Sequence, residues 1–458
     1  MNKKLGFWSI VLLTINSIIG TGIFLSPGGV AKSAGSLAPV LYICAAIFAA
    51  VLAVTFAAAS KYVNKSGAAY AYTRAAFGEK PGLFVGITRF VSASIAWGVM
   101  ATAVTKNALK IFGADPNNLL YVTIGFIILM GILFLVNIFG MKFLAFMSNI
   151  STVGKVAALA ITIVAGVIVV LTTGQNRIKE IDTLTTEAGT LVVQPMSMTV
   201  FVTALISAFY AFTGFESVAS GSGDMEAPEK NLPRAIPLAI GIIAAIYFGI
   251  VFVAMMINPV ALVTSKEVVV LASVFENPII QNIIIIGALV SMFGINIAAS
   301  FHSPRLGEAM AKDGILPKIF AKRSKNDIPV NAFLLTAALA IIVPMSFQYD
   351  MQGIMIISSI ARFVQFLVVP IAVMKFYYGK KGSDILDAPK NFITDVVIPA
   401  ISLVLTCVLL YKFDWMGQFS VTNAEGVSAP NYFAISAMII GYVVLPILFI
   451  LTNKKKAN

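Results

Sequence analysis

The sequence predicts an all-α integral membrane protein, a single transmembrane domain with twelve helices across the bilayer. Two observations predict this class. Hydrophobic residues make up 59% of the 458 residues and charged residues only 11%, whereas soluble domains carry roughly a quarter charged residues. In addition, long stretches such as 39–60 and 120–139 are apolar on every side, while a surface helix of a soluble protein shows a polar face.

The spans follow from the length of the apolar stretches. An α-helix needs about 20 mostly apolar residues to cross the hydrocarbon core. On this measure we expect spans near residues 7–33, 38–60, 83–111, 119–139, 148–172, 198–222, 235–258, 278–303, 330–347, 352–377, 396–413 and 431–451. Pro344 and Asp350 predict a very tight turn between the ninth and tenth spans.

The distribution of Lys and Arg predicts the orientation. With both termini placed in the cytoplasm, 22 of the 32 basic residues lie on the cytoplasmic side, seven lie outside, and three (Arg89, Lys155 and Arg362) lie within spans. An excess of basic residues on the cytoplasmic side is the usual bias of membrane proteins. We therefore expect a multi-pass protein of the plasma membrane with both termini in the cytoplasm. The net charge of +12 then reflects topology, and we expect no nucleic-acid partner.

Cofactor and metal chemistry find no support in the residue pattern. Cys44 and Cys407 each lie inside an apolar stretch, which gives no disulfide framework and no metal-ligand spacing. His302 is the one histidine, and the glycines at 20–22 form no phosphate-binding loop. We find no convincing catalytic set of paired acids or Ser/Lys groups. The sequence therefore predicts no cofactor, no metal site and no enzyme.

Two spans are interrupted at matching depths. In the first span, Gly20, Thr21 and Gly22 stand where an unbroken membrane helix would carry Leu or Ile. In the sixth span, the run FYAFTGFE at 209–216 places a Thr-Gly pair and an acid at mid-membrane depth. Matching breaks imply two five-helix units of similar layout. They are also the best sequence indicator of a transporter's binding site.

A broken membrane helix exposes backbone groups that need a polar partner. The half-helix after the first break offers free N–H groups and the positive end of its dipole, which suit a carboxylate. The carbonyl groups near Ile18 and Ile19, together with those of Phe209 and Ala211, suit an ammonium group. A zwitterion with amine and carboxylate on adjacent carbons matches both. The alternative is that the small residues only allow close packing of another helix.

Four segments resemble the amino acid–polyamine–organocation (APC) superfamily of amino acid permeases: GTGIF (20–24), FTGFE (212–216), GDMEAPEKNLPRAIP (223–237) and SPRLGEAMAKDGILP (303–317). The likeness covers most of the chain and weakens after about residue 380. It implies the inverted five-plus-five helix fold of leucine-type sodium symporters. The repeats would span about 7–172 and 198–377, with two extra helices at about 396–451.

The resemblance also implies roles for individual residues. The backbone amides offered to the substrate carboxylate would be those of Thr21, Gly22 and Ile23. The carbonyl groups around the amine would be those of Ile18, Ile19, Phe209 and Phe212. Tyr210 or Phe212 would form an aromatic gate, and Glu216 matches an acid that some relatives use in proton-dependent gating.

Two buried charges have competing interpretations. A charge within a span costs a few kcal/mol at least. Lys155 lies where sodium-independent relatives carry a lysine in place of a sodium ion; alternatively, its side chain extends to the cytoplasmic face. Arg362 could pair with an anionic substrate side chain or with Glu216. Alternatively, it could lie at a helix contact with Gln365.

The side-chain pocket is expected between spans three, eight and ten. The candidate residues are Ser94, Trp97, Gly98, Ala101 and Thr102, then Ile295 and Ala299, and then Ser358 and Ser359. Each could equally be an ordinary packing position. A cationic substrate would require an acidic residue in the pocket. None of these candidates is acidic, so the set favours a neutral amino acid.

Together these features predict a secondary active amino acid transporter that works by alternating access, without sodium, by proton coupling or exchange. The alternatives are a glutamate/γ-aminobutyrate or polyamine-type antiporter and, in a different class, a non-transporting amino acid sensor. The expected partners are a small-molecule amino acid, the lipid bilayer and protons. The sequence indicates no oligomeric state.

Overall fold

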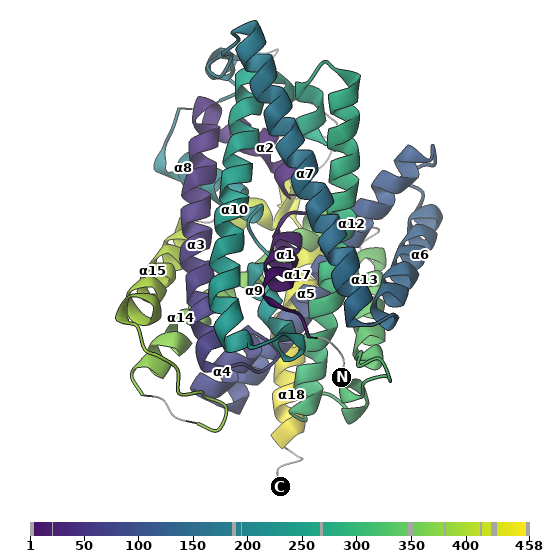
Figure 1. Ribbon diagram of the computed structural model, residues 1–458, viewed down its shortest axis with the longest axis vertical. Helices are drawn as coiled ribbons and strands as arrows, with labels where there is room; N and C mark the ends of the chain where they lie inside the picture. The colour runs from purple at the N-terminus through teal and green to yellow at the C-terminus, as the bar shows by residue number, and fades with distance from the viewer. Residues whose placement is uncertain are drawn as a thin grey trace.

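The computed structural model describes residues 4–454 except 21, 186–188, 194, 266–268, 347–350, 380–381, 413–414 and 423–427. The described chain is a bundle of helices, many of them running along the long axis of the molecule (Figure 1). Its one described sheet is a short antiparallel pair of strands, β1 (Ser420–Thr422) with β2 (Ser428–Pro430). The tight turn expected at Asp350 lies outside the described residues.

The helices follow one another with short connections. In the first part of the chain they are α1 (Phe7–Ile18), α2 (Gly22–Ala34), η1 (Gly35–Leu37), α3 (Ala38–Tyr62), α4 (Ala69–Phe77), α5 (Glu79–Ile111), α6 (Leu119–Ile138), α7 (Met141–Thr173) and η2 (Glu180–Thr183). In the middle they are α8 (Met198–Tyr210), α9 (Phe215–Val218), η3 (Ala219–Asp224), α10 (Pro228–Ile257), α11 (Pro259–Thr264), η4 (Val270–Val274), α12 (Pro278–Lys312) and η5 (Lys318–Ala321). The last are α13 (Val330–Ser346), α14 (Met351–Tyr377), η6 (Ile393–Val397), α15 (Ile398–Lys412), α16 (Trp415–Gln418), α17 (Tyr432–Ile439), η7 (Ile440–Val444) and α18 (Leu445–Lys454).

Helices lie in each of the twelve ranges expected to span the membrane. Within the described residues, seven helices are long and apolar enough to cross a membrane, or eight if α8 and the helical stretch to Asp224 count as one bent span. Several helices extend beyond the expected spans, among them α7 from Met141, α10 from Pro228 and α12 to Lys312. A helix can continue past the point where its apolar stretch ends because its backbone bonds do not depend on side-chain polarity.

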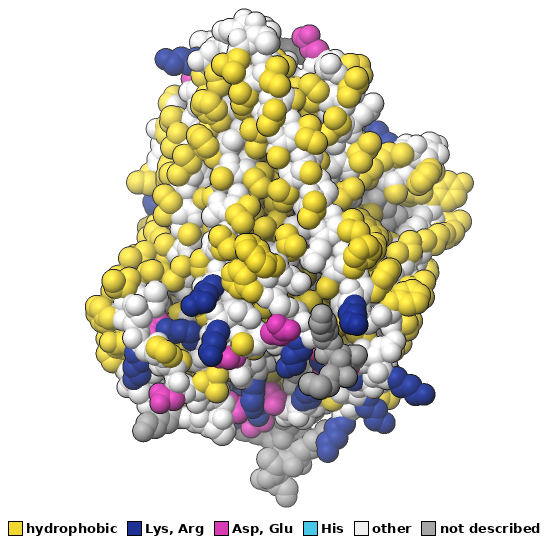
Figure 2. Space-filling model, in the orientation of Figure 1, with side chains coloured by type: hydrophobic (Ala, Val, Ile, Leu, Met, Phe, Trp, Pro, Cys, Tyr) yellow, Lys and Arg dark blue, Asp and Glu magenta, His cyan; other side chains and the backbone are white. Residues whose placement is uncertain are grey.

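The outer surface matches a lipid environment. Figure 2 shows hydrophobic side chains over most of the visible face, whereas Lys, Arg, Asp and Glu gather at the lower end. Both chain ends lie at this same lower end (Figure 1). On α6, large apolar side chains such as Ile127, Ile128 and Leu135 are more than half exposed. Exposed apolar helix faces of this kind suit lipid tails.

Helix α1 lies in the middle of the bundle, next to α7, α10 and α12 (Figure 1). Its residues from Ile10 to Ile18 are almost all buried. Helices α6 and α15 lie at the outside of the bundle in the same view. The end of α1, and the break that follows it, therefore lie deep inside the protein.

Candidate functional site

The first expected break is present between α1 and α2. Helix α1 ends at Ile18, Ile19 has an extended backbone, and α2 begins at Gly22. Thr21 itself lies outside the described residues. A side-chain carbon on Gly22 would lie 2.9 Å from the Cα atom of Ala211, in the second interrupted helix. Glycine is therefore needed here because two stretches of backbone approach closely.

The second break lies between α8 and α9. Residues 211–214 form turns, and Gly214 has φ +126°, a conformation that favours glycine. A side-chain carbon on Gly214 would collide with the carbonyl oxygen of Ser17 in α1. The two breaks therefore pack directly against each other. This contact joins segments about two hundred residues apart in the sequence.

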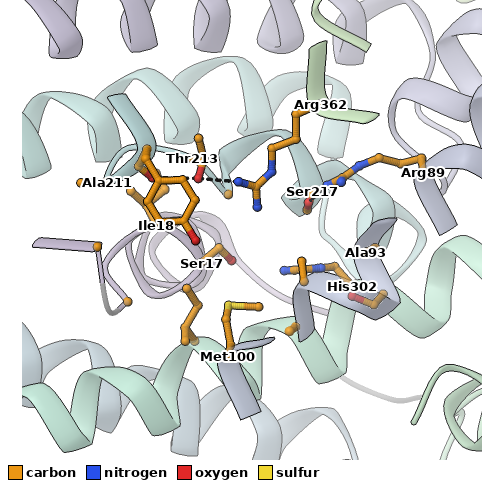
Figure 3. Close-up of a pocket in the computed structure, with 18 residues that line it drawn as sticks. Ser17, Ile18, Arg89, Ala93, Met100, Ala211, Thr213, Ser217, His302 and Arg362 are labelled. Carbon is orange, nitrogen blue, oxygen red and sulfur yellow. Dashed lines mark hydrogen bonds between the residues drawn. The ribbon is translucent and has the colours of Figure 1, made fainter. Parts of the chain in front are cut away.

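A small cavity of about 50 Å³ lies beside the two breaks (Figure 3). This space holds only a few waters. The residues that line it come from α1, α2, α5, α12, α14 and the α8–α9 region: Ser17, Ile18, Gly20, Gly22, Arg89, Ala93, Ala96, Met100, Tyr210, Ala211, Thr213, Gly214, Ser217, Ile295, Ala299, His302, Ser303 and Arg362.

The cavity contains part of the predicted site. Predicted residues in its lining are Ile18, Gly22, Tyr210, Ile295, Ala299 and Arg362. Predicted residues that are buried outside this lining are Ile19, Ile23, Phe209, Phe212, Ala101 and Thr102. The side chains of Ser358 and Ser359 lie outside the described residues.

The residues of α5 that face the cavity form a different stripe along the helix from the residues expected to do so. Arg89, Ala93, Ala96 and Met100 line the cavity, and their spacing places them on one face of a helix. Trp97, from the expected stripe, instead packs its ring 5.4 Å from that of Phe333 on α13. Both faces of α5 are apolar and buried, so only the charge of Arg89 distinguishes the cavity face in the sequence.

The two candidates for the aromatic gate have different surroundings. Tyr210 lines the cavity. Phe212 is fully buried, with its ring 4.9 Å from that of Tyr247. The Tyr247 hydroxyl also donates a hydrogen bond of 3.0 Å to the carbonyl oxygen of Ala211. Of the two aromatic side chains, only Tyr210 can touch a molecule in this cavity.

Lys155 reaches inward from α7 and is fully buried. Its Nζ atom donates to the carbonyl oxygens of Ile19 at 2.5 Å, Ser291 at 3.3 Å and Asn16 at 3.4 Å. The hydroxyl of Ser291 donates to the same Ile19 oxygen at 3.0 Å. The ammonium group thus joins α1, α7 and α12, and its side chain does not extend to the membrane surface.

A buried ionic cluster borders the cavity. Glu216 Oε1 lies 3.2 Å from Arg362 Nε and 3.6 Å from Arg89 Nη2. The pairing of Arg362 with Glu216 was one of the alternatives left open by the sequence. Arg362 also donates a 2.8 Å hydrogen bond to the hydroxyl of Thr213, and Arg89 donates to the hydroxyl of Ser217. Figure 3 shows the Arg362 guanidinium pointing into the cavity, across from Ser17 and His302.

A second ionic cluster closes the end of the molecule at which both termini lie. Asp224 accepts hydrogen bonds from buried Arg305 and, at 2.7 Å, from Arg323. Glu308 in turn pairs with Arg323 and Lys312. These contacts tie η3 to α12 and to the segment after η5. The sequence alone could not identify Arg305 and Arg323 as the partners of Asp224, because these residues are distant in the chain.

Comparison with known proteins gives the family. A family profile described as amino acid permease matches residues 5–449, nearly the whole chain. The chain belongs to the amino acid permease family. This permease is 40% identical, over 97% of its length and 93% of the relative's, to the uncharacterized transporter Rv1979c of Mycobacterium tuberculosis.

More distant relatives carry functional names. The permease is 27% identical to the serine/threonine exchanger SteT of Bacillus subtilis, over 82% of each chain. It is 28% identical to the large neutral amino acids transporter small subunit 2 of Oryctolagus cuniculus, over 73% of this chain and 63% of the relative. The protein is thus a multi-pass membrane transporter of the APC superfamily with a small-molecule amino acid as its class of substrate, and not an enzyme.

Proposed function

We propose that this permease is a secondary active transporter that moves an amino acid across the plasma membrane by alternating access, without sodium. Its helices would cross the membrane twelve times, as two inverted five-helix repeats followed by two C-terminal helices, with both termini in the cytoplasm. Two observations support this topology: the broken helices stand five spans apart, and basic side chains gather at the end with both termini (Figure 2). No oligomeric contact enters the proposal.

The main chain of the substrate would bind at the two breaks. The N–H groups at the start of α2, at Gly22 and Ile23, have no partner within the helix and would bind the carboxylate. The N–H group of Thr21, which lies outside the described residues, would join them. The amine would meet carbonyl groups at the ends of α1 and α8, where Ile18 and Tyr210 line the cavity. Tyr210 would cover the bound molecule. The packing of Gly22 against Ala211 and of Gly214 against Ser17 is the observation that carries this site.

Lys155 would hold the interrupted helix in place without a metal ion. Its ammonium group contacts carbonyl oxygens on both sides of the site, from α1 and from α12. A sodium ion would need a similar set of oxygen ligands at the same point. A resident ammonium group therefore makes a coupling sodium ion unnecessary.

The coupling mode is tested by transport measurements on the purified full-length protein in liposomes. Uptake of labelled amino acids is compared in empty and preloaded vesicles, with and without a pH gradient, and with sodium replaced by choline. Exchange or proton-driven uptake that persists without sodium supports the proposal. Dependence on sodium would contradict the role of Lys155, and binding of amino acids without flux would indicate a sensor instead.

A further inference from the structure

The cavity beside the two breaks has an unequal charge balance. Two arginines, Arg89 and Arg362, line it, whereas none of the eighteen described lining residues is acidic. The nearest acid, Glu216, is fully buried and contacts both arginines. His302 also lines the cavity, and an imidazole can be neutral or positive but never negative. The cluster therefore carries at least one more positive than negative charge.

The carboxylate of Glu216 lies between the two arginines. Its Oε1 atom faces both guanidinium groups, and its Oε2 atom accepts the backbone N–H of Gly214 at 2.8 Å. Within the described structure, Arg89 Nη1 and Arg362 Nε donate no hydrogen bond and Glu216 Oε1 accepts none, although all three atoms are buried. One carboxylate thus serves two arginines and leaves donor capacity unused on each. Buried donors without partners are costly, and more so when they are charged.

An excess positive charge at this depth calls for an anionic partner. Charged groups inside a membrane protein pair with one another or mark the path of a charged substrate. Arginine is also the side chain whose planar donor set matches a carboxylate in a bidentate fashion. The cavity already lies beside the proposed site for the main-chain groups of the substrate. A second carboxylate on the same molecule would then reach the arginines.

We propose that the permease selects amino acids with a carboxylate side chain, of the aspartate and glutamate class. This inference rests on the proposed function: the main-chain carboxylate binds at the start of α2, and the side-chain carboxylate binds between Arg89 and Arg362. It replaces the neutral substrate favoured by the sequence alone. That expectation rested on nine candidate residues without an acid. Of these, Ile295 and Ala299 lie in the described cavity lining, and the set left Arg89 without a role.

Binding of such a substrate requires a wider cavity than the present one. The space of about 50 Å³ is smaller than an amino acid, since it corresponds to only a few waters. Arg362 comes from α14 and Arg89 from α5, so a substrate carboxylate between them would link two helices of different repeats.

The test uses pairs of amino acids that differ only in the side-chain charge. Exchange is measured in liposomes with glutamate against glutamine and aspartate against asparagine. We expect the acids to be preferred over the amides by about tenfold or more. The reason is that an amide side chain would leave the buried arginines without an anionic partner. In Arg362→Gln and Arg89→Gln the preference for the acid should disappear, and Arg362→Lys should retain part of it. Lys32→Gln, which removes an exposed charge from α2, is the matched control and should leave the preference unchanged.

The outcomes separate this inference from the function on which it rests. Equal or faster exchange of glutamine and asparagine would overturn the acidic selectivity and leave amino acid transport intact. No exchange of any amino acid would overturn the proposed function itself. If the arginine variants do not fold, thermal stabilisation of the wild-type protein by glutamate but not glutamine supports the inference, and equal stabilisation contradicts it. The assays are repeated with gluconate salts in place of chloride salts. Stabilisation by glutamate that requires chloride would mean that the arginines bind a free anion instead of the side-chain carboxylate, and would contradict the inference.

Discussion

The Nζ atom of Lys155 on α7 lies 2.5 Å from the carbonyl oxygen of Ile19, the residue at which α1 gives way to the break before α2. The same ammonium group reaches the carbonyl oxygen of Ser291 on α12. The Lys155 side chain thus provides a hydrogen-bond donor for the Ile19 oxygen at the break and links it to α12. The break is in this way stabilised by a side chain outside the cavity lining.

Replacing this lysine should destabilise the protein and stop transport. In Lys155→Met, the side chain keeps most of its bulk but donates no hydrogen bond, so the buried oxygens of Ile19 and Ser291 lose a partner. Each such loss costs about 1–3 kcal/mol. We expect a lower melting temperature and a loss of most exchange activity. The exposed Lys412→Met serves as the control, and a Lys155→Met protein that exchanges at the wild-type rate would contradict the role of this residue.

Two glycines of α2, Gly22 and Gly29, provide a matched pair of substitutions. Gly22→Ala would place a carbon 2.9 Å from Ala211 Cα, whereas Gly29→Ala would meet no atom within 4 Å. We expect Gly22→Ala to weaken substrate binding strongly, since the two breaks can no longer approach. Gly29→Ala should bind normally and gain up to about 1 kcal/mol of helix stability. Substrate-induced thermal shifts measure both, and equal shifts would refute the site.

Glu216→Gln should affect stability and the pH profile of transport more than affinity. The substitution removes the one negative charge shared by Arg89 and Arg362, and breaking a buried ion pair from one side costs about 3–5 kcal/mol. Glu226→Gln, at an exposed position, is the control. Thermal unfolding and the pH dependence of flux are measured for both variants. An unchanged pH profile in Glu216→Gln would contradict a role for Glu216 in coupling transport to protons.

One surface ion pair outside the membrane spans gives a pH-dependent contribution of known sign. The hydrogen bond from Lys65 holds the pKa of Asp384 below its ordinary value. A carboxyl group whose pKa is lowered by folding stabilises the protein above its unfolded pKa of about 3.9, and this contribution is lost as the pH falls through the folded pKa. The pair is partly exposed, so it contributes at most about 1 kcal/mol to the free energy of unfolding, and salt reduces this contribution.

Asp384→Asn should therefore lower the melting temperature slightly at neutral pH and low salt. The difference from wild type should vanish when the solution is acidified below the folded pKa, because the wild-type carboxylate is then protonated too. Asp115→Asn, also exposed, controls for the loss of a surface charge. A difference that persists unchanged in acid would mean that the substitution acts through packing and not through the charge pair.

The sequence predicted the breaks because they violate local rules. Glycines and a polar residue at 20–22, and the Thr-Gly pair at 213–214, have no place in an unbroken membrane helix, so the two breaks could be predicted without coordinates. Lys155 was conspicuous for the same reason. The surroundings of these residues were harder to infer, because hydrogen bonds such as that from Lys155 to Ile19 join segments that are distant in the chain.

The cavity face of α5 could not be read from the sequence. Both sides of this helix are apolar because one packs on α13 and the other borders the cavity, so the hydrophobic pattern does not tell them apart. Arg89 was the sole signal for the cavity side. The choice between Tyr210 and Phe212 likewise depends on the turn at 211–214, whose geometry is set by packing of Gly214 against α1.

The most direct test is a cryo-EM structure of the permease with its best-exchanged amino acid bound. We predict the α-carboxylate of that amino acid within hydrogen-bonding distance of the backbone N–H groups of Gly22 and Ile23, with its amine beside the carbonyl groups at the end of α1. Density for the amino acid away from both breaks, or a helix running continuously from α1 into α2, would contradict the proposed site.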